Sequence, residues 1–122
     1  MTPEEALVPQ LSPHTDGGDV ALTMLADPAV PAVLKPYIKF RRAQGIAKYG
    51  TPLGWYDGRN MGAETVQEMM DLYIYTYKAE RTCKNAGVRS MMEAVRLDMA
   101  AHMSRFLRLT PDMFEQNQEE PE

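Results

Sequence analysis

The chain has 122 residues, of which 44% are hydrophobic and 25% charged, with a formal net charge of -4 and a single cysteine. These values are ordinary for a soluble globular protein, and the length suits one domain with a core of its own. Because Cys83 is alone, an internal disulfide and a cysteine-based zinc site are excluded. No apolar run approaches the roughly 18 residues that a membrane span requires, so we expect no membrane partner and a reducing cytoplasm as the compartment.

The charges are unevenly distributed along the chain. All 13 Lys and Arg residues lie between positions 31 and 109, where only seven of the 17 acids are found. Residues 1–30 and 110–122 carry five acids each and no Lys or Arg. A basic middle favours an anionic ligand in that part of the chain. Acidic ends that serve only solubility would give the same distribution, so both interpretations stay open.

The amino-terminal part is predicted to be an arm followed by a short helix. Residues 1–18 contain three prolines and end in two glycines, which is typical of a flexible acidic arm. Asp19 is suited to cap a helix that continues to about Ala26. The Asp27–Pro28 pair then ends this helix.

A longer helix is predicted from about Pro36 to Tyr49. Proline is tolerated in the first turn of a helix, and Gly50 is a suitable residue for its carboxyl end. Residues 51–60 are rich in proline and glycine and are predicted to form a loop.

Two long helices follow, and each has an apolar stripe at helical spacing. The first is predicted over residues 62–85 and the second over 88–109. The stripe of the second alternates spacings of four and three, close to a coiled-coil seam. The stripes consist of Val66, Met69, Met70, Tyr73 and Tyr77, and of Val88, Met92, Val95, Met99, Met103 and Phe106.

No strand pattern is present, so the predicted fold class is all-α. We expect a small bundle of about four helices over residues 19–109, followed by an acidic, disordered tail over 110–122. Two long apolar faces in so small a chain also favour a homo-oligomer.

Three acids on the first long helix form a candidate metal site. Glu64, Glu68 and Asp71 are spaced i, i+4, i+7, which places them within about 60° of one another around the helix. Carboxylates one turn apart can hold Mg²⁺ and leave positions for a phosphate ligand. The alternative is a solvated face opposite the apolar stripe.

Basic residues of the preceding helix are candidates for binding phosphate. Lys35, Lys39 and Arg42 repeat the i, i+4, i+7 spacing, and Lys48 lies at the helix end. The alternative is ion pairing with the acids of residues 64–71, worth only about 0–1 kcal/mol per exposed pair. The stripe is short and no nucleic-acid motif accompanies it, which argues against a nucleic-acid partner.

The loop that follows contributes aromatic candidates. Trp55 can stack on a base while Arg59 meets a phosphate. A loop tryptophan that folds back on the core is the alternative. The predicted substrate-binding residues are Lys39, Arg42, Lys48, Tyr49, Trp55 and Arg59.

The sequence resembles a known family over about residues 38–80. Lys48-Tyr49-Gly50-Thr51-Pro52-Leu53, Asp57-Gly58-Arg59-Asn60, and the run from Gln67 through Glu68 and Asp71 to Tyr75 are similar to short MazG-like nucleotide pyrophosphohydrolases common in bacteriophages. The resemblance implies an all-α enzyme, a dimer or tetramer, in the cytoplasm of an infected host. Such enzymes use Mg²⁺ to cleave the α–β phosphoanhydride of (deoxy)nucleoside triphosphates.

The resemblance assigns roles to only part of the expected site. Glu68 and Asp71 match the Glu-x-x-Asp metal motif of the family and are the predicted catalytic residues, with Glu64 as a further metal ligand. A Glu-Glu-x-x-Glu motif on the preceding helix has no counterpart here, and Glu93 and Asp98 are candidate replacements. The alternative function is non-catalytic: a nucleotide-sequestering anti-defence protein, or an oligomeric interaction or structural module.

Overall fold

The computed structural model describes residues 2–10, 18–55 and 58–109. These residues form helices joined by turns, with no strand among them, which confirms the predicted all-α class. None of the described helices is both long and apolar enough to cross a membrane. The tail predicted over 110–122 and part of the arm, residues 1 and 11–17, lie outside the described residues.

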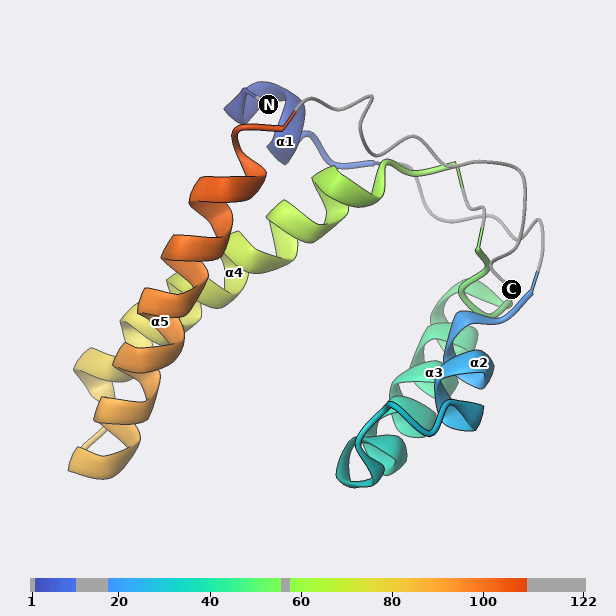
Figure 1. Cartoon of the computed structure of the whole chain (residues 1–122), viewed down its shortest axis with the longest axis horizontal. Coiled ribbons are helices and arrows are strands. Elements are labelled where there is room, and N and C mark those ends of the chain that lie inside the picture. Colours follow the sequence, from blue (N-terminus) through green and yellow to red (C-terminus); the bar gives the residue numbers. More distant parts are fainter. Residues whose placement is uncertain (1, 11–17, 56–57, 110–122) are drawn as a thin grey trace. The chain divides into compact units, whose positions relative to one another are not determined.

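The chain divides into two compact units, each formed by segments that pack against one another (Figure 1). Described residues 2–9 and 60–109 make up one unit, and described residues from 10 to 59 make up the other. The first unit contains α1 (Pro3–Leu7), α4 (Met61–Thr82) and α5 (Ala86–Phe106); the second contains α2 (Val20–Ala26), the 3-10 turn η1 (Ala32–Leu34) and α3 (Lys35–Tyr49).

Helices α4 and α5 form an antiparallel hairpin, the main packing contact of the first unit (Figure 1). Each begins at an asparagine whose side-chain oxygen accepts a backbone N–H three residues on: Asn60 from Ala63 and Asn85 from Val88, both at 3.0 Å. The predicted boundaries were displaced here, because Asn85 caps α5 instead of ending α4. Helix α4 therefore ends at Thr82 and α5 begins at Ala86, two residues before the predicted start.

The core of the hairpin is small. Val66 is fully buried, and Ala63 and Met103 are nearly so. All six residues of the predicted α5 seam are buried or half-buried, which confirms that face. The predicted α4 stripe is confirmed except at Tyr77, which is 46% exposed with the Arg81 guanidinium 3.4 Å over its ring.

A short helix lies within the segment predicted as an arm. Helix α1 packs on α4, and the Gln67 amide donates to the Val8 carbonyl oxygen at 2.9 Å. The sequence pattern of residues 1–18 contained no signal for this helix beyond Pro3 at its first position.

The second unit is built on α3, with α2 packed beside it (Figure 1). Asp19 caps α2 as predicted, because its side chain accepts the Leu22 N–H at 3.2 Å. Gly50 ends α3 in the left-handed region at φ 81°, also as predicted. The Val20 N–H donates to the Leu53 carbonyl at 3.0 Å and ties α2 to the loop after α3.

Candidate functional site

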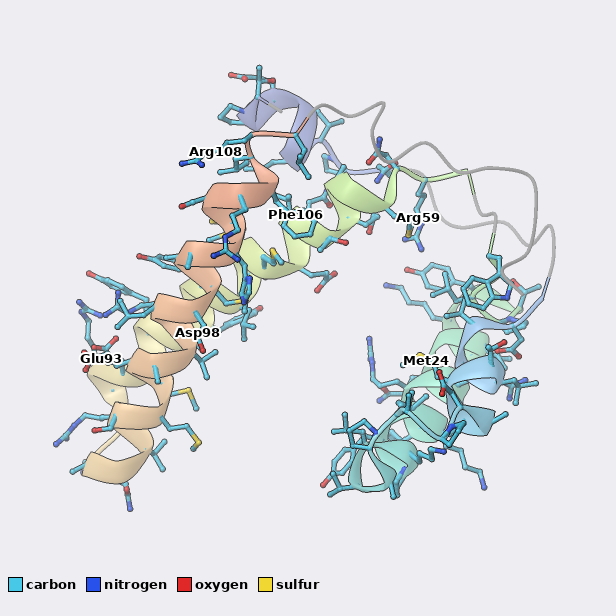
Figure 2. The ribbon with its side chains drawn as sticks, in the orientation of Figure 1. Met24, Arg59, Glu93, Asp98, Phe106 and Arg108 are labelled. Atoms are coloured by element: carbon cyan, nitrogen blue, oxygen red, sulfur yellow. The ribbon has the colours of Figure 1, made fainter. Side chains whose placement is uncertain are left out.

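The unit formed by α2 and α3 contains a cavity of about 550 Å³. This volume lies within the range of about 300–1,000 Å³ that small-molecule sites occupy. Most of its wall is apolar, and α2, η1, α3 and the loop after α3 all contribute. The apolar wall includes Val20, Met24 (labelled in Figure 2), Leu34, Ile38, Pro52 and Leu53.

Five larger side chains give the cavity its polar and aromatic character: Tyr37, Tyr49, Arg41, Arg42 and Arg59. Three of them, Arg42, Tyr49 and Arg59, belong to the predicted substrate-binding set. A cavity that combines aromatic rings with guanidinium groups suits a ligand with a planar ring and an anionic group.

The other predicted substrate-binding residues lie outside this wall. Lys39 is exposed on α3, and Lys48 places its ammonium 5.0 Å from the centre of the Tyr49 ring. Trp55 is half-buried in the loop. The three residues are not among those that line the cavity.

Arg42 is fixed by an acid of its own unit. Its Nε and Nη2 atoms both lie 2.8 Å from Asp19 Oδ2. The hydrogen bond from Arg42 lowers the pKa of the Asp19 carboxyl, although partial burial acts in the opposite direction. Sequence reasoning offered the acids of residues 64–71 as partners for the basic stripe, whereas the structure pairs Arg42 with the capping residue of α2.

Arg41 is held differently from its neighbour. Its Nη1 donates to the Gln44 side-chain oxygen at 2.8 Å. An amide carries no charge, so this contact orients the guanidinium and leaves its positive charge available to an anion. Arg41 is therefore better placed than Arg42 to bind a phosphate in the cavity.

The candidate metal-binding acids lie on α4, in the other unit. Glu68 and Asp71 are exposed, and Glu64 is half-buried in the first turn of the helix. Glu93 and Asp98, the candidate replacements for the missing motif, are exposed on α5 (Figure 2).

Across the described part of the chain, no three His, Cys, Asp or Glu residues gather in a way that would hold a metal ion. The described residues therefore give no support for a three-carboxylate Mg²⁺ site. A two-carboxylate site at Glu68 and Asp71, completed by waters and substrate phosphates, remains a prediction.

A second, polar hollow of about 390 Å³ lies at the turn between α4 and α5. Two arginines and two glutamates line it, so their charges largely cancel and the hollow has little preference for an ion of either sign. One of the glutamates, Glu80, accepts the Nε–H of Arg96 at 2.7 Å and joins the two helices.

Sequence reasoning missed two features of the cavity. Tyr37 had a usable signal, because Tyr37, Arg41, Gly45 and Tyr49 follow one another at four-residue spacing and share a helix face. Asp19 was recognised as a cap but not as the partner of Arg42, since the two residues are 23 positions apart.

Three comparisons with known proteins found no relative of this chain. The sequence matches no protein-family model, and no curated protein and no solved structure is significantly similar to it.

Proposed function

We propose that the chain binds a (deoxy)nucleoside triphosphate in the cavity between α2 and α3. One observation carries the proposal: an apolar cavity of ligand size is lined by two tyrosines and three arginines. A nucleotide has matching parts, because its base is planar and weakly polar and its phosphates are strongly anionic. Tyrosine rings stack on bases, and guanidinium groups bind phosphate oxygens in pairs.

The resemblance to MazG-like pyrophosphohydrolases points to the same ligand class by a separate route. Its most specific parts are the segment from Lys48 to Leu53 and the run from Gln67 to Asp71. The first of these contributes four residues to the cavity wall and ends α3 at Gly50. Cleavage is a further step, and it would require Glu68 and Asp71 to ligate Mg²⁺. The proposal is therefore nucleotide binding, with hydrolysis as the outcome to be measured.

Titration of the protein with a panel of nucleoside triphosphates, with and without Mg²⁺, tests binding by calorimetry. Pyrophosphate release is measured in the same samples. Arg41→Gln should weaken binding roughly tenfold or more, because a hydrogen bond to a charged group contributes about 1.5–3 kcal/mol. Arg108→Gln is the matched control, since Arg108 is an exposed arginine beyond the end of α5 (Figure 2).

Each result selects one function. Binding with pyrophosphate release identifies a hydrolase, and binding without release identifies a nucleotide-sequestering protein. If wild-type protein binds none of the nucleotides, or if Arg41→Gln and Arg108→Gln behave alike, the cavity is not the nucleotide site.

A second candidate is an oligomeric interaction module. The observation that favours it is the exposed apolar surface of the α4–α5 hairpin, where Ile74 is 55%, Tyr75 69%, Met91 55% and Leu97 54% exposed. A second copy of this chain would cover part of this surface, because self-complementary helical faces commonly form symmetric dimers. Sedimentation velocity over a range of concentrations tests this candidate independently of any ligand.

A further inference from the structure

Gly45 occupies the middle of α3 and lines the cavity. Glycine in a helix interior is less favourable than alanine, because it loses more backbone freedom on folding. A Cβ atom built at position 45 would meet nothing within 4 Å beyond its neighbours in the chain and the backbone of its own helix. The packing of the described residues therefore gives no reason for a glycine at this position.

The neighbours of Gly45 on the same face of α3 make the missing side chain informative. Arg41 lies one turn before Gly45 and Tyr49 one turn after it, and all three line the cavity. Side chains at this spacing normally contact one another along the helix. Because position 45 has no side chain, the helix surface between Arg41 and Tyr49 has a gap there.

The part of the cavity wall that α2 contributes is apolar, which suits contact with the flat face of a base. Val20 and Met24 of α2 contribute to it. A ring placed on the α3 backbone at Gly45 would have the tyrosine on one side and the arginine on the other. A base lying on the backbone meets both neighbours with its edges, by edge contact with the tyrosine ring and by hydrogen bonds from the arginine to the acceptor atoms of the base.

We propose that the gap at Gly45 receives the base of the nucleotide, with the backbone of α3 as the floor on which the base lies. This inference rests on the proposed nucleotide binding and assigns the position of the base within the cavity. Tyr49 contacts the ring, and Arg41 marks the direction in which the phosphates extend. A methyl group at position 45 would occupy the layer next to the backbone, where carbon atoms of the ring need about 3.5–4.0 Å of separation.

The proposal predicts opposite effects on stability and on binding for one substitution. Gly45→Ala should raise the urea midpoint of unfolding, because alanine is the better helix former and its methyl group meets no neighbour. The same change should weaken ATP binding about fivefold or more. A glycine that had only a structural role would not give this combination.

The experiment compares the binding of two ligands to wild type and to two variants of Gly45. ATP and inorganic tripolyphosphate are titrated by calorimetry into wild type, Gly45→Ala and Gly45→Leu, without Mg²⁺. ATP affinity should fall in the order of side-chain size and by more than a hundredfold for leucine, whereas tripolyphosphate affinity should stay within about twofold of wild type. Ala47→Leu is the matched control, because Ala47 is an exposed α3 residue that does not line the cavity.

Each contrary result overturns a different statement. If wild type binds ATP and Gly45→Leu binds it equally well, the base does not lie at Gly45 and the nucleotide site itself stands. Equal losses for ATP and tripolyphosphate would place phosphate, and not the base, at this position. If wild type binds neither ATP nor any other nucleoside triphosphate of the panel, the proposed function fails together with the inference.

Discussion

Two methionines on α5 offer a direct test of which face of that helix is the core. Met103 is 7% exposed and belongs to the seam against α4, whereas Met91 is 55% exposed. Met→Ala at both positions makes the same chemical change in the same helix, so the difference between the two variants isolates burial.

The expected costs follow from the burial of each side chain. Replacing a buried methionine by alanine lowers the free energy of unfolding by about 2–5 kcal/mol. Met103 lies in the last turn of α5, where neighbours relax more readily, so we expect about 2–3 kcal/mol for Met103→Ala. Met91→Ala should change the free energy of unfolding by no more than about 0.5 kcal/mol if Met91 stays exposed.

Urea unfolding followed by far-ultraviolet circular dichroism measures both values, and it should be repeated at several protein concentrations. A monomer has a concentration-independent midpoint, whereas an oligomer becomes more stable as concentration rises. If a second copy covers Met91, the cost of Met91→Ala will therefore grow with concentration. A Met103→Ala variant that is no less stable than Met91→Ala at every concentration would refute the assignment of the α5 core.

Three further predictions follow from the structure. Hydrogen bonds from Arg42 and Arg96 lower the pKa values of Asp19 and Glu80 in the folded protein, so both carboxylates stabilise the fold above their unfolded values of about 3.9 and 4.3. This contribution should be lost as the pH falls below about 4, and Glu80→Gln should flatten the acid limb of a plot of urea midpoint against pH. The exposed apolar residues of α4 and α5 predict a homo-oligomer, which a strictly monomeric sedimentation profile at high micromolar concentration would contradict. Glu68→Gln and Asp71→Asn should each abolish Mg²⁺-dependent pyrophosphate release if the protein is a hydrolase, without altering its circular dichroism spectrum.

Helices α2, α3, α4 and α5 were predictable because their signals are local. Asp19 at the start of α2 and Gly50 at the end of α3 act through hydrogen bonds to residues three or four positions away. The seam of α5 was predictable for a related reason, since its period alone specifies the face that must be covered. The start of α5 was misplaced because Asn85 is also a common residue at helix ends, and only the structure shows that its side chain accepts the Val88 N–H.

The cavity was only partly predictable because it depends on contacts between distant residues. Charge and ring type predicted Arg42, Tyr49 and Arg59 as substrate-binding residues, and all three line the cavity. The same chemistry also predicted Lys39 and Lys48, but neither residue lines the cavity. The helical period of α3 could not tell the residues that line the cavity from those that do not. The position of α2 decides which part of the α3 surface becomes a cavity wall. The Asp19–Arg42 ion pair and the hydrogen bond from Val20 to Leu53 both join α2 to the α3 segment.

The acids of α4 and the cavity beside α3 belong to separate units. ATP titrations of wild type and Asp71→Asn, with and without Mg²⁺, test whether Asp71 takes part in nucleotide binding. If Asp71 ligates the Mg²⁺ of a bound triphosphate, Mg²⁺ should strengthen ATP binding to wild type, and Asp71→Asn should remove that gain. If Asp71 belongs only to a solvated face, Asp71→Asn should leave ATP affinity unchanged with and without Mg²⁺, and its effect on stability should be about 0.5 kcal/mol or less. The first result would assign Asp71 to the Mg²⁺–nucleotide complex. The second would leave the cavity as a binding site and the acids as surface residues.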